Sequence, residues 1–171
     1  MTIGIDVTPY EAVDLIQKRL KDKKIILRKR MKDMLKRLNE KILNNDFFDK
    51  KYLQAIDIDE LLDLRDDKEF DDGWVRVFEK TKEYSIKSEI VEQIDEIREN
   101  VFKKIYDLTE SSDLAAYISD DFDLMCRAYI VELNDEWLAK VAHIYNDKRI
   151  PSEKMMVVAE NYKEEFLKLF E

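Results

Sequence analysis

Only two glycines and two prolines occur among the 171 residues of this chain. Hairpins, tight turns and phosphate-binding loops depend on glycine, because they need backbone angles that other residues avoid. So few glycines exclude a β-rich fold, a Walker-type phosphate loop and a dinucleotide-binding fingerprint. The chain is therefore predicted to be all-α, with long helices joined by short connections.

Hydrophobic residues make up 45% and charged residues 40% of the chain, against a usual charged fraction of about 25%. This balance is typical of amphipathic helices, each with one apolar stripe and a broad charged face. The length predicts a single domain over residues 1–171, with enough buried surface to fold without a metal or a disulfide.

Three features predict a cytoplasmic protein. The first residues lack the basic and apolar regions of a signal peptide. No run of about 18 apolar residues is present, so no membrane span and no membrane partner are expected. Cys126 is the single cysteine, which fits a reducing compartment.

The clearest helix is predicted over Pro9–Leu43. Thr8 and Glu11 have the spacing of a capping box, and Pro9 would occupy the first helical position. Apolar residues then recur every three or four positions, apart from one gap at Lys23-Lys24. Residues 1–8 are predicted to form an extended arm.

The rest of the chain predicts further helices with one irregular region. Residues 46–66 indicate a connector of two short helices, the second capped by Asp57 with Glu60. A long helix is predicted from Asp66, where Asp66 and Glu69 could form a third capping box, to Leu108. Another pattern follows to Ile144, with a break near Asn134-Asp135, and a last helix is predicted from Ser152. The predicted fold is an antiparallel bundle of three to four long helices with a short irregular helical cap.

Charge is unevenly distributed along the chain. The net charge is −9, yet Lys18–Lys41 contains twelve basic and three acidic residues, a net of +9, which leaves −18 for the remainder. Asp57–Asp72 contains nine acidic and two basic residues. Either the two regions neutralise each other within the bundle, or their faces stay exposed and bind partners.

The exposed alternative gives a set of candidate partner-binding residues. Direct binding to nucleic acid is not expected, because the whole chain is acidic and the basic segment has no aromatic residues for base stacking. The acidic stretch better fits a protein that occupies a basic groove. The candidates are Lys23, Lys24, Arg28, Lys29, Arg30, Asp66, Asp67, Asp71 and Asp72.

No catalytic, cofactor-binding or metal-binding residue is predicted, and no cofactor. The only histidine, His143, lies about 25 Å along its predicted helix from Cys126, too far for a direct pair. One histidine cannot build a ferritin-like site or a Cys–His zinc site. Carboxylate pairs at helical spacing leave one enzymatic alternative, an all-α Mg²⁺-dependent nucleotide hydrolase, although such pairs arise by chance in a chain with 39 acidic residues. The pairs are Glu89/Glu92, Glu96/Glu99 and Glu132/Asp135.

The leading prediction is a non-catalytic helical protein that binds another protein as a regulator, adaptor or inhibitor. A narrower version is an acidic inhibitor of a nucleic-acid-binding protein, of the kind encoded by phages or mobile elements. The alternatives are the Mg²⁺-dependent hydrolase and a self-assembling structural subunit, and a homo-oligomer is left open.

Overall fold

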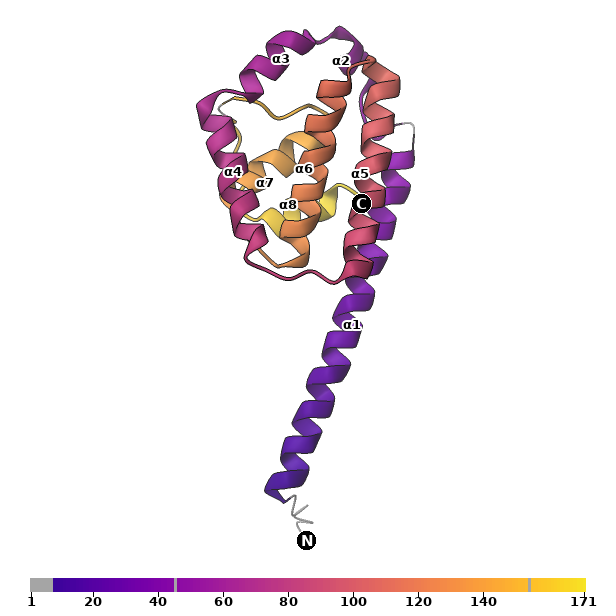
Figure 1. Cartoon of the computed structure of the whole chain (residues 1–171), viewed down its shortest axis with the longest axis vertical. Helices are drawn as coiled ribbons and strands as arrows, with labels where there is room; N and C mark the ends of the chain where they lie inside the picture. The colour runs from indigo at the N-terminus through magenta and orange to yellow at the C-terminus, as the bar shows by residue number, and fades with distance from the viewer. Residues whose placement is uncertain (1–7, 45, 154) are drawn as a thin grey trace. The chain divides into compact units, whose positions relative to one another are not determined.

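The computed structural model describes residues 8–44, 46–153 and 155–171, and all its regular elements there are helices (Figure 1). This confirms the all-α prediction. The predicted arm at residues 1–8 lies outside the described residues, except for Thr8. The described elements are α1 (Pro9–Leu43), α2 (Lys50–Ala55), α3 (Ile58–Arg65), α4 (Lys68–Lys82), α5 (Ser88–Thr109), α6 (Ser112–Ile130), α7 (Glu136–Asn146) and α8 (Tyr162–Lys168).

The chain forms two compact units, residues 1–34 and residues 35–171. In the first unit, the predicted capping box is present: the Thr8 N–H donates to Glu11 Oε2 at 2.9 Å, and the Glu11 N–H donates to Thr8 Oγ1 at 3.3 Å. Every residue of α1 from Val13 to Arg30 is exposed. The gap at Lys23-Lys24 therefore does not mark a change in burial.

The second unit begins inside α1, where the same apolar stripe enters a core. Leu35, Leu38 and Ile42 are buried there. Asn39 binds α5 through both ends of its amide, because its Nδ2 donates to Glu96 at 3.0 Å and its Oδ1 accepts from Asn100 at 2.9 Å. The end of α1 is thus fixed along α5.

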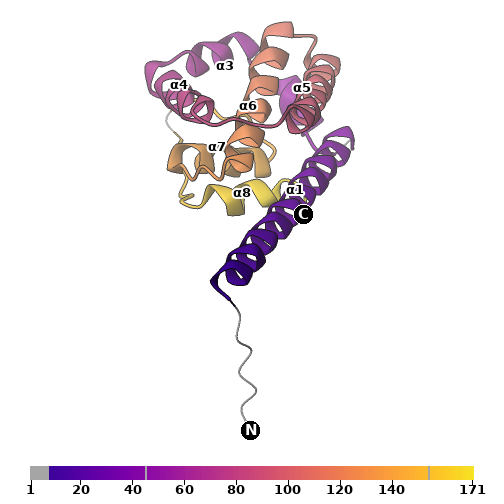
Figure 2. The same cartoon turned by 60° about the horizontal axis from the view of Figure 1, so that its bottom comes forward.

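An antiparallel pair of helices, α5 and α6, forms the centre of the second unit (Figure 1). Ser111 caps α6 by accepting from the Leu114 N–H at 3.2 Å, so the turn between the two helices is short, as the sequence predicts. Helices α7 and α8 pack on each other and form a second layer against α6 (Figure 2). The predicted break near Asn134-Asp135 is confirmed, since Asp135 caps α7.

The predicted continuous helix from Asp66 to Leu108 is wrong, because it divides into α4 and α5. The cap is Asp67 rather than Asp66. With 3.6 residues per turn, the buried residues of the two segments would point roughly 120° apart on one straight helix, so that helix could bury only one of the two faces. The buried residues are Phe70, Gly73, Val77 and Thr81 in α4, and Ile90, Ile94, Ile97, Val101 and Ile105 in α5.

The predicted helix from Ser152 is also wrong. Helix α8 begins only at Tyr162, with Asn161 as its cap, and Glu153 has a φ of 48° that a right-handed helix does not allow. Met155 and Ala159 are buried, whereas Met156 is exposed. The apolar residues of this segment therefore anchor an irregular crossing.

Gly73 has a packing role that the sequence does not reveal. Gly73 is buried within α4. A Cβ atom here would lie 2.3 Å from Nε1 of Trp137, which comes from α7. The absence of a side chain lets the Trp137 indole lie directly against the α4 backbone.

Candidate protein-binding face

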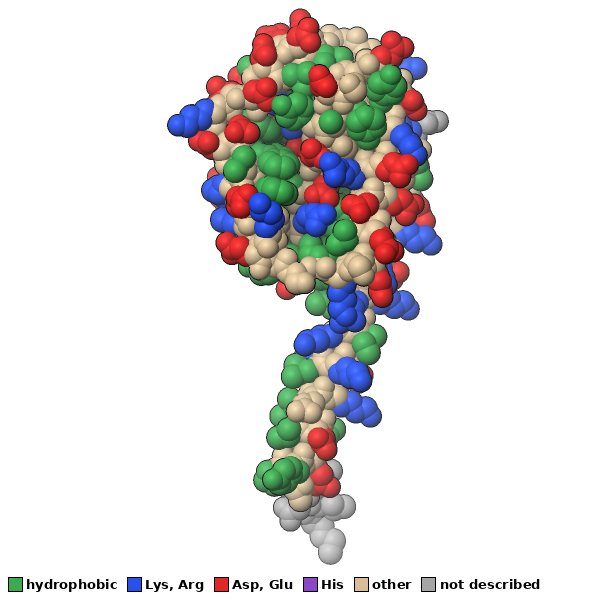
Figure 3. All heavy atoms as spheres, in the orientation of Figure 1, with side chains coloured by type: hydrophobic (Ala, Val, Ile, Leu, Met, Phe, Trp, Pro, Cys, Tyr) green, Lys and Arg blue, Asp and Glu red, His purple; other side chains and the backbone are tan. Residues whose placement is uncertain are grey.

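The stretch Asp57–Asp72 forms a continuous charged surface over α3 and the start of α4. All nine of its carboxylate side chains are exposed, and Figure 3 shows acidic side chains gathered over these two helices with hydrophobic side chains among them. We call this surface the acidic face. It consists of Asp57, Asp59, Glu60, Asp63, Asp66, Asp67, Glu69, Asp71 and Asp72.

Local helix structure explains why acidic residues are tolerated so close together. Asp57 caps α3 by accepting from the Glu60 N–H at 3.0 Å, and Asp67 caps α4 by accepting from the Glu69 N–H at 3.0 Å. The first turns of both helices present free N–H groups and the positive end of the helix dipole, which favour negative side chains. Two closely spaced helix starts therefore concentrate carboxylates on one surface.

Few of these charges are neutralised within the protein. In the described residues, none of the nine carboxylates has an ion-pair partner. Of the two basic residues in the stretch, only Lys68 is exposed, because Arg65 is 2% exposed and points into the core. The acidic face therefore presents nine negative charges and one positive charge to a partner.

Beneath the acidic face, Arg65 is held by a buried polar network. Its Nη2 donates to both carboxylate oxygens of Asp121 at 2.8 and 2.9 Å, and its Nη1 donates to the Pro151 carbonyl at 2.7 Å. The Tyr145 hydroxyl and the Trp74 indole also donate to Asp121, at 2.5 and 3.1 Å. This network joins α3, α4, α6 and α7.

The network sets the charge states of its members. Burial lowers the pKa of Arg65, but Asp121 and Tyr145 raise it by more, so the guanidinium stays charged. Burial and the neighbouring Asp121 carboxylate raise the pKa of Tyr145 well above its usual value, so its hydroxyl keeps its proton. The Arg65 Nε is buried without a hydrogen-bond partner within the described part of the chain. Sequence analysis missed this network, although Arg65 follows the buried Leu61 by four residues, one turn along the apolar face of α3.

A pocket of about 210 Å³ opens beside the acidic face. Phe70 and Trp74 of α4 and Tyr117 of α6 provide aromatic walls, and Val75 adds an aliphatic one. The Tyr117 hydroxyl donates to Asp66 of the acidic face at 2.7 Å. The acidic face and the pocket are thus parts of one continuous surface.

The structure brings together only some of the residues that the sequence proposes as partner contacts. The four acidic candidates gather at the junction of α3 and α4, within the second unit. The basic candidates are spread along α1 in the first unit and are all exposed; their role as contacts stays a prediction. The acidic candidates are Asp66, Asp67, Asp71 and Asp72, and the basic ones are Lys23, Lys24, Arg28, Lys29 and Arg30.

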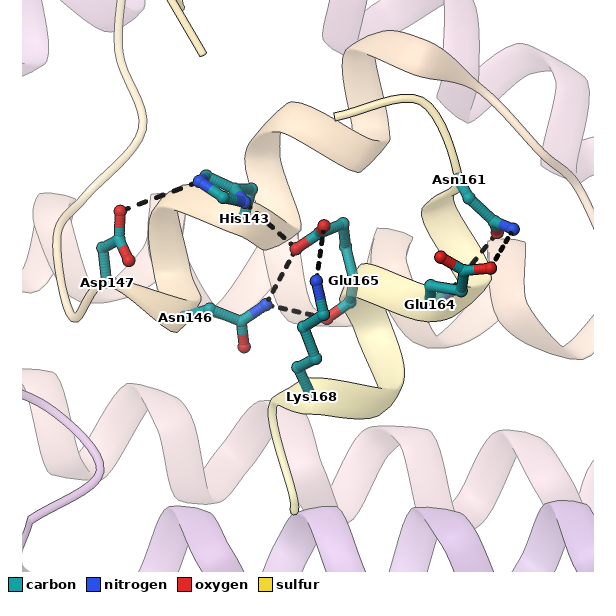
Figure 4. A network of polar contacts seen from close by, with 7 residues as sticks. All are labelled: His143, Asn146, Asp147, Asn161, Glu164, Glu165 and Lys168. Carbon is teal, nitrogen blue, oxygen red and sulfur yellow. Dashed lines mark hydrogen bonds and ion pairs between the residues drawn. The ribbon is translucent and has the colours of Figure 1, made fainter. Parts of the chain in front are cut away.

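His143 and Cys126 lie in different surroundings, one in a polar cluster and the other in the core. The His143 Nδ1 lies 3.1 Å from Glu165 Oε2, and its Nε2 lies 3.8 Å from Asp147 (Figure 4). Lys168 and Asn146 also donate to Glu165, so the cluster ties α8 to α7. Cys126 is completely buried, and burial raises the pKa of its thiol. The contacts of His143 therefore hold two helices together, and Cys126 is part of the packed core.

This cluster predicts a loss of stability in acid. Burial raises the pKa of Glu165, but Lys168 and His143 lower it by more, so its pKa lies below the usual 4.5. The ionised carboxylate therefore stabilises the fold above that pH, and this contribution is lost as the pH falls through the lowered value. We expect Glu165→Gln to reduce the decline in unfolding free energy between about pH 5 and 3, measured by urea denaturation across that range.

The matched control for this prediction is Glu160→Gln, which changes an exposed carboxylate nearby in the sequence. It should leave the pH dependence as in the unmodified protein. At pH 7, Glu165→Gln should also lower the free energy of unfolding by about 1 kcal/mol, because the exposed Lys168 and the half-buried His143 and Asn146 lose a charged acceptor. If the unfolding free energy of Glu165→Gln depends on pH as steeply as that of the unmodified protein, this cluster does not couple folding to pH.

The carboxylate pairs proposed for Mg²⁺ do not gather in one place. Residues 8–44, 46–153 and 155–171 contain no group of three or more His, Cys, Asp or Glu side chains arranged to hold a metal ion. Asp135, which the sequence pairs with Glu132, instead binds Arg76 and lies 3.6 Å from Lys80. Burial raises the pKa of Asp135, but its bonds to Arg76 and the Leu138 N–H lower it by more. Its surroundings are those of a structural ion pair that joins α4 to α7.

None of the helices in the described part of the chain combines the length and the apolar composition needed to cross a membrane. No curated protein matches the sequence. The family model of Immunity protein PIM1 matches residues 37–152, which is more than half of the chain and includes the whole acidic face and its pocket. The chain therefore belongs to the PIM1 immunity protein family.

Proposed function

We propose that this immunity protein acts by binding a toxin protein through the acidic face and so blocking the toxin's active surface, without chemistry of its own. The observation that carries the proposal is the set of nine exposed carboxylates that have no ion-pair partner within the described residues. Carboxylates confined to one face repel one another, and a basic partner surface would relieve that repulsion. The fold thus presents a surface suited to a positively charged protein.

The charge of the acidic face also favours a class of target. Proteins that act on nucleic acids carry basic grooves that neutralise phosphates. A rigid surface with many carboxylates can occupy such a groove and exclude the nucleic acid. Charge complementarity of this kind steers association and can raise its rate by one to three orders of magnitude at low salt. We therefore propose a toxin that acts on nucleic acid.

The test uses the tagged full-length chain to capture its partner from a nuclease-treated lysate of the source organism at low salt. The captured protein is then purified, and its affinity is measured for the unmodified chain and for the Asp59→Lys/Asp63→Lys/Asp72→Lys variant. These three side chains are exposed and take part in no helix cap. We expect the triple variant to bind at least about 100-fold more weakly, mainly through slower association, and to stop protecting cells from the toxin.

The matched control is Glu92→Lys/Asp107→Lys/Glu160→Lys, which makes the same change in net charge at exposed positions outside the acidic face. It should keep nearly full affinity and protection. Equal losses in both variants would mean that net charge, and not this face, governs binding. Full protection by the Asp59/Asp63/Asp72 variant would refute the proposal.

A further inference from the structure

The pocket beside the acidic face has the size of a site for one side chain. Its volume of about 210 Å³ is below the roughly 300–1,000 Å³ of sites that enclose a small molecule. Tyr117 and Val75, at its walls, are 37% and 43% exposed. A side chain of a bound protein can therefore reach the pocket from the surface.

The charges around the pocket favour a cation. Arg65 lies at its wall, but the Asp121 carboxylate 2.8 Å away matches that positive charge. Asp120 is paired with Arg98 at 2.5 Å. Asp71, which also lines the pocket, has no ion-pair partner in the described residues, and Asp66 lies just beyond it on Tyr117. Two carboxylates are left without a matching positive charge.

The aromatic walls favour a cation with a flat head or a long apolar stem. The Arg65 guanidinium already lies 4.6 Å from the centre of the Phe70 ring and 5.5 Å from that of Tyr117. Because Phe70 and Tyr117 already contact this cation, a second cation would lie against Trp74, the remaining aromatic wall, whose face has a negative potential. Val75 and the Trp74 ring provide apolar surface for a methylene chain.

We infer that this pocket binds an arginine or lysine side chain of the partner, which enters along Val75 and places its charge beside Asp71. Arginine is enriched among the residues that dominate binding energy, and such residues occupy well-packed pockets surrounded by weaker contacts. In this arrangement the acidic face attracts the partner, and the pocket fixes its position. The identity of the partner rests on the proposed function, but the preference of the pocket for a cation does not.

The test uses the isolated full-length protein and small probes, so it does not need the toxin. N-acetyl-arginine amide is titrated while the indole N–H signals of the two tryptophans are followed by NMR, and Trp74→Phe assigns them. N-acetyl-citrulline amide has nearly the same shape without the charge. We expect the Trp74 signal to shift with a dissociation constant in the millimolar range, and citrulline to bind about fivefold more weakly or worse.

Two variants locate the binding in the pocket. Val75→Arg places a cation of the protein itself in the pocket and should abolish the shift, whereas Asp71→Asn should weaken arginine binding severalfold. The control Asp107→Asn removes one exposed carboxylate elsewhere and should have no effect. Three results would each overturn the inference: no Trp74 shift with arginine, equal binding of citrulline, or preferential binding of N-acetyl-tyrosine amide through the Arg65 Nε. Any of these results would leave the charge-reversal test of the acidic face unaffected.

Discussion

Asp121→Ala should lower the free energy of unfolding by about 3–5 kcal/mol, the range found when one partner of a buried ion pair is removed. The side chains of Arg65 and Asp121 are each 1% exposed. Without Asp121, the Arg65 charge would stay buried with the Pro151 carbonyl as its remaining acceptor, and the Tyr145 hydroxyl and the Trp74 indole would lose theirs. Urea denaturation at pH 7 measures the change.

Two further variants separate the effect of leaving a buried charge unpaired from the effect of replacing an aspartate on this helix. Arg65→Met/Asp121→Ala removes both charges, and because no charge is left buried, we expect it to be less destabilised than Asp121→Ala alone. Asp120→Ala is the control, because Asp120 is the neighbouring residue on the same helix and pairs with Arg98, with side chains that are 41% and 50% exposed. It should cost no more than about 1 kcal/mol. A loss that small in Asp121→Ala would show that water or a local rearrangement compensates Arg65.

Gly73→Ala should lower the free energy of unfolding by about 1–3 kcal/mol, the usual cost of overfilling a packed core. In an exposed helix the same change would stabilise by about 1 kcal/mol, because alanine favours the helix. Here the added methyl group would meet the Trp137 indole at 2.3 Å. Trp137 is held in turn by an edge-to-face contact with Phe70, with ring centres 5.2 Å apart. The indole therefore cannot move without disturbing α4.

A double-mutant cycle tests this explanation. In a Trp137→Leu background the obstacle is gone, so Gly73→Ala should become neutral or stabilising. Thermal unfolding of the four proteins gives the coupling energy between the two positions. The same destabilisation with and without the indole would place the strain elsewhere in α4.

Local signals in the sequence predicted the helices that depend on local chemistry. Thr8 and Asp57 cap helices where the sequence placed them. The errors arose where tertiary packing decides the outcome. The division between α4 and α5 depends on which side of each helix meets α6, and the irregular crossing before Tyr162 depends on a core that its apolar residues reach without forming a helix. A periodic pattern along one segment contains neither kind of information.

The candidate site also has a part that local sequence predicts and a part that depends on tertiary packing. The acidic face could be predicted because it is a local concentration of charge, and every carboxylate in it is exposed. Arg65 was counted among the charges of that stretch, yet its partner Asp121 lies 56 residues further along the chain. The pocket needs α4 and α6 to approach each other. Neither could be inferred without knowing which distant helices meet.

The acidic face lies over the buried pair of Arg65 and Asp121, and the two differ in how well they tolerate substitution. Substitutions at exposed positions away from helix caps usually change stability by less than about 0.5 kcal/mol, so the carboxylates of the acidic face other than the two helix caps, Asp57 and Asp67, can be replaced at little cost to the fold. Arg65 and Asp121 beneath it have no such freedom. A protein organised in this way can change the specificity of the binding surface that we propose through successive surface changes, each tolerated on its own, while the buried pair keeps every intermediate folded.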